Sequence, residues 1–261
     1  MDRERFVATW VERLQRQEPD AVAILLKGSD ARDAAGPHSD VDFDVLTTTG
    51  PREAYLAYLV ETGEGRLTHV SVAVCDIESW LAQEGEPAEW AFPWPAAEAT
   101  RLVWTRDETL RQRLARPFLP HPPAAPELED FIAGFGKVKN ADVAGNELAL
   151  RLAAQGMAQL CPSLLRLVNP EVRVGTRYEA LLASLDLPVS PPGYREDLLV
   201  CLGFVGHATT VDEVHSAARR LVTGVVKLLQ PHAERLASEF EPDLPSHLAD
   251  GTLQRYVEEE T

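Results

Sequence analysis

The chain has 261 residues and a formal net charge of −16 at pH 7, and its hydrophobic fraction of 45% is typical of globular proteins. Such a negative surface repels phosphate backbones, and the sequence holds no concentrated basic patch, so we expect no nucleic-acid partner. No apolar run approaches the roughly 18 residues that a membrane span needs, so we expect no membrane partner either.

The first part of the chain predicts a small mixed β-sheet with flanking helices. Short apolar or alternating runs of strand length occupy residues 21–26, 40–46, 67–75 and 101–105. Apolar residues recur at helical spacing in residues 5–17, 55–60, 77–81 and 107–116. The second of these helical segments places Tyr55, Leu56, Leu59 and Val60 on one side, and we expect it to be a helix.

A proline-rich stretch then marks a domain boundary. Residues 117–126, PFLPHPPAAP, contain five prolines, and the segments beyond them have helical periodicity. Gly145 should separate two of these helices, and Thr210 with Glu213 should form a capping box at the start of another. We therefore expect an α+β chain with a sheet domain at 1–119, a linker at 120–126 and an all-α helical bundle at 127–261.

Three aspartates of the second strand should share one face. Side chains two residues apart in a strand point to the same side, so Asp40, Asp42 and Asp44 lie opposite the core-facing valines and phenylalanine between them. Carboxylates this close repel one another unless they share protons or a cation. Magnesium is the usual cation, since it takes oxygen ligands and shares them with substrate phosphates. Asp44 lies further along the strand, and we expect it to bind an arginine or water.

The same stretch resembles a known family. Gly28-Ser29, followed about ten residues later by Asp40-Val41-Asp42, is similar to the signature of the polymerase β-type nucleotidyltransferases. The fuller pattern, with Arg32 and Gly36-Pro37-His38-Ser39 before the acidic strand, most resembles kanamycin nucleotidyltransferase and related aminoglycoside-modifying enzymes. Residues 187–233 are also similar to the C-terminal part of that family. The resemblance implies transfer of a nucleoside monophosphate from ATP, or another NTP, to a hydroxyl of a small acceptor, with Mg²⁺ as cofactor.

The resemblance also assigns roles to individual residues. Asp40 and Asp42 become the catalytic metal ligands, Gly28 allows close backbone approach, and the Ser29 hydroxyl bonds a β- or γ-phosphate oxygen. Arg32 either reaches a phosphate or a carboxylate or forms an ordinary surface ion pair. Ser39 either closes the turn or contacts the nucleotide. Lys139, or Lys137, matches a phosphate-contacting lysine on the first long helix of the second domain.

Two positions depart from the family. The third metal carboxylate, on the strand at 67–75, is matched by His69, which either ligates the metal or fills a strand end. The family's glutamate base stands four residues before the lysine, where this chain has Ala133 or Phe135. These departures leave a nucleotide-binding pseudoenzyme as an alternative. An enzyme that modifies a protein or tRNA, like the nucleotidyltransferase antitoxins, is a second alternative.

Composition adds expectations about partners and compartment. The acidic surface would attract a cationic acceptor such as an aminoglycoside-like antibiotic. Cys75, Cys161 and Cys201 are odd in number and widely spaced in apolar surroundings, and the N-terminal MDRERF is no secretion signal. We therefore expect a cytoplasmic protein with reduced cysteines. A homodimer is an arrangement that the sequence leaves open.

Overall fold

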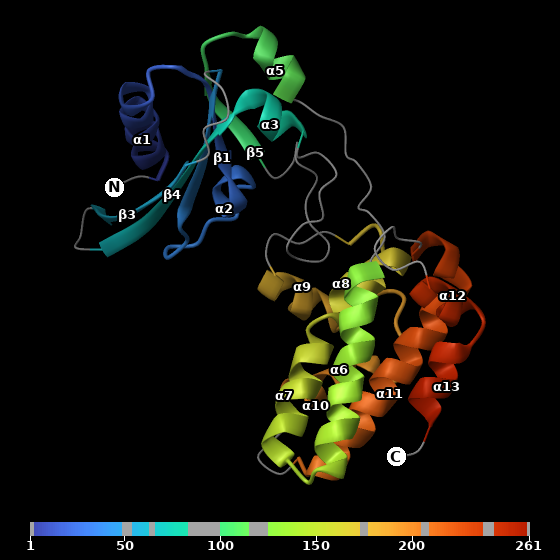
Figure 1. Cartoon of the computed structure of the whole chain (residues 1–261). Helices are drawn as coiled ribbons and strands as arrows, with labels where there is room; N and C mark the ends of the chain where they lie inside the picture. The colour runs from blue at the N-terminus through green and yellow to red at the C-terminus, as the bar shows by residue number, and fades with distance from the viewer. Residues whose placement is uncertain are drawn as a thin grey trace. The chain divides into compact units, whose positions relative to one another are not determined.

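A computed structural model describes residues 3–48, 54–62, 66–82, 100–114, 125–172, 177–204, 209–236 and 243–259. These residues fall into two compact units, the first ending at residue 114 and the second beginning at residue 125 (Figure 1). The first unit is a sheet with helices and the second is helical, which confirms the expected α+β fold class.

The first unit is built on a mixed sheet of five strands in the order β3-β4-β2-β1-β5. Strands β2 and β4 are parallel, and the other neighbouring pairs are antiparallel. The strands are β1 (Ala21–Lys27), β2 (Val41–Thr47), β3 (Ala54–Thr62), β4 (Arg66–Asp76) and β5 (Thr100–Thr105). Four of the five were expected from the sequence.

The fifth, β3, corrects the prediction of a helix at residues 55–60. The segment pairs with β4 in antiparallel register from Ala54 opposite Val74 to Thr62 opposite Arg66. Tyr58 packs against α1 (Arg3–Gln17), with its ring centroid 5.1 Å from that of Trp10. In so short a segment, helical spacing and strand alternation select overlapping residues, and pairing with a neighbouring strand decides between them.

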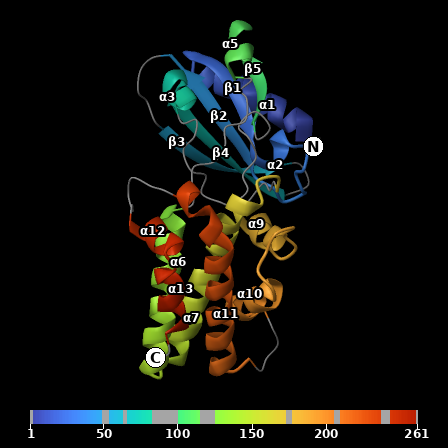
Figure 2. The ribbon, with the colours of Figure 1, turned by 90° about the vertical axis from the view of Figure 1, so that its right-hand side faces the viewer.

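Helices cover the two faces of the sheet differently (Figure 2). Helix α1 buries Trp10 and Leu14 against the face that carries Phe43 and Val72. At one end of the opposite face, α3 (Ile77–Ala82) and α5 (Thr109–Leu114) pack on Leu46. This second face, called here the acidic face, carries Asp42 and Asp44, as strand alternation predicts. A short helix, α2 (Gly28–Ala31), follows β1 directly.

The second unit packs its helices around one apolar core, in which α11 contributes eight buried residues. Gly145, with φ of +62°, separates the first two helices as expected. Thr210 and Glu213 make both hydrogen bonds of the predicted capping box at the start of α11. The elements are α6 (Ala125–Val143), α7 (Glu147–Ala158), α8 (Cys161–Leu165), η1 (Arg166–Val168), α9 (Arg177–Ser184), α10 (Tyr194–Leu202), α11 (Val211–Leu229), η2 (Gln230–Leu236), α12 (Asp243–Ala249) and α13 (Thr252–Glu258).

Across the described residues, the structure contains no helix with the length and apolarity of a membrane span.

Candidate active site

The candidate site lies where β1 ends beside the start of β2. These strands are antiparallel, with Lys27 opposite Asp42, so the turn at Gly28 stands next to the acidic strand. Gly28 has φ of +65°, and a Cβ built there would lie 3.0 Å from Asp42 Oδ2. The backbone therefore passes so close to the carboxylate that a side chain would add crowding to strain. Glycine at this position brings the turn against Asp42.

The rest of the motif lies in α2 and the segment after it. Ser29 lies in α2, Arg32 follows as its C-cap, and both are half-buried. Ser39 Oγ accepts a hydrogen bond of 2.9 Å from the Gly36 N–H, so Ser39 closes the turn before β2. The contacts that Ser29, Arg32 and Ser39 would make with a nucleotide stay predictions.

The three aspartates that were predicted to share a face differ in their surroundings. Asp40 is exposed, Asp42 is half-buried and Asp44 is buried. Asp44 Oδ2 lies 3.2 Å from Lys27 Nζ and accepts a hydrogen bond of 2.8 Å from Trp80 Nε1. Lysine and tryptophan thus take the place of the expected arginine or water. Because these partners engage Asp44, Asp40 and Asp42 are the better candidates for a metal.

Asp42 is electrostatically poised to accept a cation. Burial raises the pKa of its carboxyl group, and the neighbouring Asp40 raises it further. A hydrogen bond from Ser71 and the charges of Lys27 and His69 act in the opposite direction without cancelling the rise. Tyr55 on β3 in turn donates a hydrogen bond of 2.9 Å to Ser71 Oγ. A divalent cation would neutralise the repulsion between Asp42 and Asp40. It would also offset the cost of removing the Asp42 charge from water.

His69 lies on the acidic face near the two aspartates. Val41 pairs with Val70 and Asp42 with Ser71, so His69 is one position before the first of these pairs on β4. Its side chain is exposed, and a positive charge on its imidazole lowers the pKa of the Asp42 carboxyl group. Among the described residues, no three His, Cys, Asp or Glu side chains are arranged as a metal site. A metal-binding role for His69 therefore stays a prediction.

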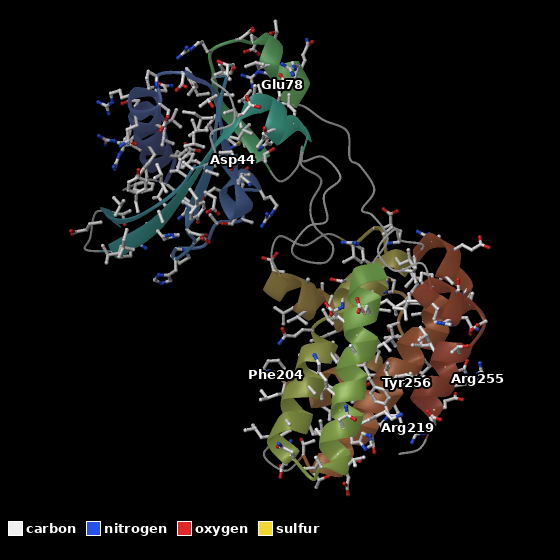
Figure 3. The ribbon with its side chains drawn as sticks, viewed as in Figure 1. Asp44, Glu78, Phe204, Arg219, Arg255 and Tyr256 are labelled. Carbon is white, nitrogen blue, oxygen red and sulfur yellow. The ribbon has the colours of Figure 1, made fainter. Side chains whose placement is uncertain are left out.

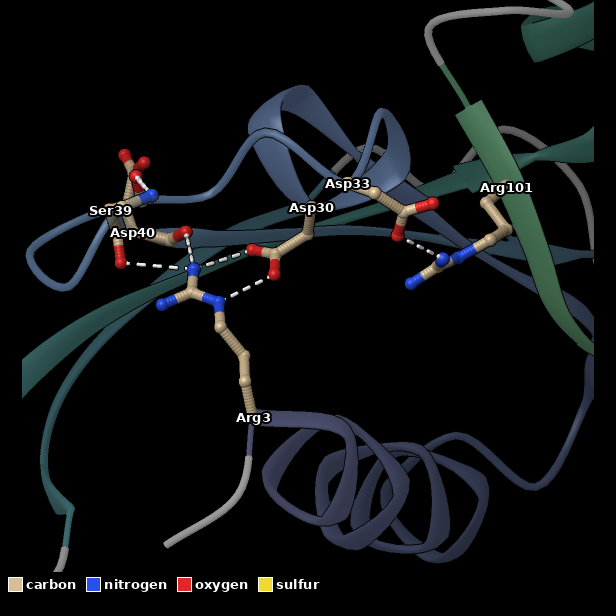
Figure 4. A network of polar contacts seen from close by, with 7 residues as sticks. Arg3, Asp30, Asp33, Ser39, Asp40 and Arg101 are labelled. Carbon is tan, nitrogen blue, oxygen red and sulfur yellow. Dashed lines mark hydrogen bonds and ion pairs between the residues drawn. The ribbon is translucent and has the colours of Figure 1, made fainter.

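Arg3 holds the two ends of the motif segment together (Figure 4). Its guanidinium donates to both carboxylate oxygens of Asp30, with 2.6 Å between Nη2 and Oδ2. The same Nη2 donates to the backbone carbonyls of Ser39, at 3.1 Å, and Asp40, at 2.7 Å. Asp30 is 6% exposed, so this bidentate pair is shielded from water on the carboxylate side.

Sequence reasoning missed Arg3, Ser71 and Trp80 as neighbours of the site. Ser71 could have been found, because the parallel register of β2 and β4 sets it opposite Asp42. Trp80 lies in the helix after β4, 36 positions beyond Asp44 in the sequence. The periodicity of the sequence does not predict a contact between residues so far apart. The contact of Arg3 with Asp30 likewise joins residues that are 27 positions apart in the sequence.

Comparison with known proteins shows a likeness in the helical unit. Residues 127–231 match a family model described as nucleotidyltransferase, substrate binding domain. This match covers about two fifths of the chain, so the helical unit is similar to the substrate-binding domain of nucleotidyltransferases. A crystal structure of a nucleotidyltransferase-like protein from Exiguobacterium sibiricum is similar with 14% identity and a TM-score of 0.48, over 87% of this chain and 77% of that one. Comparison with curated proteins gives no match.

The two lysines predicted to contact the phosphates, Lys137 and Lys139, lie on α6 of the helical unit. Lys139 Nζ lies 3.4 Å from each of the backbone carbonyls of Tyr256 and Glu259, and 4.9 Å from the centroid of the Tyr256 ring. Tyr256, labelled in Figure 3, belongs to α13. Lys137 is exposed, like Ala133 one turn earlier, whereas Phe135 is buried. The contacts of Lys139 hold α13 to α6, and its proposed role at the phosphates stays a prediction.

Proposed function

We propose that this protein is a nucleotidyltransferase, which transfers a nucleoside monophosphate from ATP, or another NTP, to a hydroxyl group of a small acceptor, with Mg²⁺ as cofactor. One observation carries the proposal: the backbone at Gly28 passes against Asp42 Oδ2, and the Asp40 carboxylate is close enough to act on the charge of Asp42. A phosphate-binding turn beside two carboxylates is what metal-assisted transfer to a hydroxyl requires.

The residues present fit a hard divalent cation. Asp40 and Asp42 offer carboxylate oxygens, the ligands that Mg²⁺ prefers. The pKa of Asp42 is raised, so Lys27, His69 and Ser71 do not fully stabilise its negative charge. When bound, the metal would neutralise triphosphate charge and favour ionisation of the attacking hydroxyl. The chain's own groups would then position the reactants, with Gly28 allowing the close approach of the phosphates and the Ser29 hydroxyl donating to a phosphate oxygen. Arg3 keeps the turn and the acidic strand in register.

An aminoglycoside-like antibiotic is the acceptor class that we propose first. Two observations support it: the net charge of −16 would attract a cationic molecule, and residues 127–231 match a substrate-binding domain of nucleotidyltransferases. An antibiotic-modifying enzyme of this kind would confer resistance.

A screen of acceptors with NTPs and Mg²⁺, followed by pyrophosphate release, tests the proposal. We expect turnover with at least one hydroxylated acceptor, and a fall of at least about 100-fold in Asp42→Asn. Asp33→Asn is the matched control, since its carboxylate lies in the same segment, is 81% exposed and pairs with Arg101. Activity that survives Asp42→Asn at the native level would contradict the proposed role of the acidic strand.

A nucleotide-binding pseudoenzyme is the second candidate, and one observation favours it. The residue paired with Asp42 on β4 is Ser71, and the neighbouring position on the same face is His69, so the strand offers no third carboxylate there. A protein with two carboxylates could still bind a nucleotide while turning it over slowly or not at all.

Replacing His69 by glutamate separates the two candidates. We predict that His69→Glu shows higher Mg²⁺-dependent transfer than the native protein, by about tenfold, because a carboxylate suits Mg²⁺ better than imidazole does. Leu67→Glu is the control, since it adds the same charge two residues earlier on the same strand, at a side chain that is 61% exposed. Absence of turnover in both the native protein and His69→Glu would favour the pseudoenzyme. Loss of activity in His69→Glu would give the histidine a catalytic role.

A further inference from the structure

A depression of about 380 Å³ lies on the sheet unit beside the candidate active site. Lys27 and Asp44 line one part of it, Tyr55 from β3 and Trp80 from α3 line the sides, and Ala73 and Cys75 of β4 contribute to its lining. Its volume is within the range of small-molecule sites in proteins, roughly 300–1,000 Å³. Two aromatic side chains and a few polar groups are also the usual lining of such sites.

The depression is one strand repeat away from the proposed metal ligands. Asp44 follows Asp42 by two residues on the same face of β2, a separation of about 7 Å along the strand. Ala73 is paired with Asp44, just as Ser71 is paired with Asp42. A ring bound over Ala73 would therefore have its edge within reach of a group held at Asp42.

Lys27 presents the charge that a ligand in the depression contacts, because the Asp44 carboxylate paired with it is buried. Asp44 is 3% exposed, and its Oδ2 is engaged by both the Lys27 ammonium and the Trp80 indole N–H. The Lys27 side chain is 45% exposed, so a ligand meets its positive charge. An ammonium has three N–H donors, and those that Asp44 does not take can donate to a hydroxyl oxygen. An ammonium group placed against Lys27 Nζ would meet a like charge at contact distance, nearer than the Asp42 carboxylate, which lies about 7 Å away along β2.

We propose that this depression binds the ring of the acceptor that carries the reacting hydroxyl, and that Lys27 selects an uncharged, hydroxyl-bearing ring over an aminated one. The ring's apolar face would lie against Trp80 and Tyr55, and its hydroxyl oxygens would accept from Lys27. This assignment rests on the proposed function and deepens it, since it defines the reacting part of the acceptor. Ammonium groups elsewhere on the acceptor are compatible with it, because only the bound ring meets Lys27.

Nuclear magnetic resonance tests this site without turnover. The indole N–H resonance of Trp80, assigned by its loss in Trp80→Phe, is followed during titration with two probes. The probes are methyl α-D-glucopyranoside and its 6-amino-6-deoxy derivative, which differ by one ammonium group. We expect a saturable shift with the neutral sugar and affinity about tenfold weaker for the aminated one, a factor that corresponds to about 1.4 kcal/mol. No shift with the neutral sugar, or equal or tighter binding of the aminated one, would overturn the proposal.

Removing the Lys27 charge should reverse this preference. In Lys27→Met the Asp44 carboxylate loses its cationic partner, so the ratio of the two dissociation constants should move by about tenfold toward the aminated sugar. Lys27→Gln, which keeps a donor without the charge, replaces this variant if it does not fold and should show the same direction of change. Arg113→Met is the matched control, because it removes a cation that pairs with Glu78 of α3, and should leave the ratio unchanged. An unchanged ratio in the Lys27 variant, or an equal change in Arg113→Met, would overturn the role of Lys27.

The outcome can be separated from that of the proposed function. If the protein releases pyrophosphate with an acceptor while the Trp80 resonance does not respond to that acceptor, the transferase stands and this site fails. If the resonance responds to the neutral sugar but no NTP is turned over with any acceptor, the site stands and the proposed function fails.

Discussion

The carboxyl group of Asp42 has a raised pKa because burial and the neighbouring Asp40 disfavour its charge. A carboxyl group whose pKa is higher in the folded than in the unfolded chain binds more protons when the protein is folded. The folded state therefore loses stability as the pH rises from the ordinary value of 3.8 through the raised pKa. At neutral pH, charged Asp42 destabilises the metal-free protein, as residues kept for function often do.

We predict that Asp42→Asn raises the melting temperature of the metal-free protein at pH 7 and weakens the loss of stability as the pH rises above 3.8. Asparagine keeps an oxygen that can accept from Ser71 but carries no charge to be desolvated. Thermal unfolding at several pH values measures the effect, with Asp33→Asn as the exposed control. A melting temperature below the native value at pH 7 would show that charged Asp42 stabilises the fold.

Arg3 and Arg101 allow a second comparison at the residue scale, because both bind aspartates of the same segment (Figure 4). The Arg3 pair has a carboxylate that is 6% exposed, whereas in the Arg101 pair the carboxylate is 81% exposed. Removal of one partner from a shielded pair leaves an uncompensated buried charge, which costs more than the loss of a surface pair.

We predict that Arg3→Met lowers the free energy of unfolding by about 2–4 kcal/mol, whereas Arg101→Met lowers it by less than about 1 kcal/mol. Urea unfolding measures both. Arg3→Met should also raise the KM for the NTP, because Arg3 holds the carbonyls of Ser39 and Asp40 beside the motif turn. Equal losses of stability in the two variants would mean that the shielding of Asp30 has no energetic consequence.

At the scale of elements, the junction of β1 and α2 places two constraints on one residue. Gly28 has a positive φ, and a Cβ there would lie 3.0 Å from Asp42 Oδ2. Gly203, at the end of α10, has φ of +79° with nothing within 4 Å of an added Cβ. A substitution at Gly203 therefore adds backbone strain alone, whereas a substitution at Gly28 adds backbone strain and crowds the Asp42 carboxylate.

We predict that Gly28→Ala and Gly203→Ala each lower the free energy of unfolding by about 1–2 kcal/mol, because alanine is strained at positive φ. Gly28→Ala should in addition lower transferase activity by at least about tenfold, since the added methyl group displaces Asp42 or the turn. Unfolding and activity measurements on both variants check this. Equal activity in the two variants would contradict the close approach of the turn to the carboxylate.

The elements also show which features sequence reasoning reaches. Strands β1, β2 and β4 were predicted because each is an apolar or alternating run, and α11 because Thr210 and Glu213 encode its capping box. The helix predicted for the residues of β3 is wrong because these residues form a strand by pairing with β4. The local pattern of apolar residues does not predict that pairing. Alternation alone predicts the faces of β2, and the structure places Asp42 beside Gly28. Arg3 and Trp80 depend on contacts between distant segments, which a single sequence does not specify.

At the scale of the whole molecule, two kinds of evidence come from different halves of the chain. The sheet unit carries the motif turn and the acidic strand, and the helical unit matches the substrate-binding domain of nucleotidyltransferases. The likeness of the helical unit could be anticipated from residues 187–233, whereas the contacts that Lys139 makes could not. Lys139 contacts Tyr256 of α13 and Glu259, the residue that follows α13, and both lie more than a hundred positions further along the chain.

The most direct test of the central claim follows two isotopic labels of ATP in the presence of Mg²⁺ and an acceptor found by the screen. Nucleotidyl transfer predicts that label in the α-phosphate moves to the acceptor, while label in the γ-phosphate appears in pyrophosphate. Both transfers should be lost in Asp42→Asn and kept in Asp33→Asn. Movement of the γ-label to the acceptor would indicate a kinase, and α-label that never reaches any acceptor would contradict the account of this protein as a working nucleotidyltransferase.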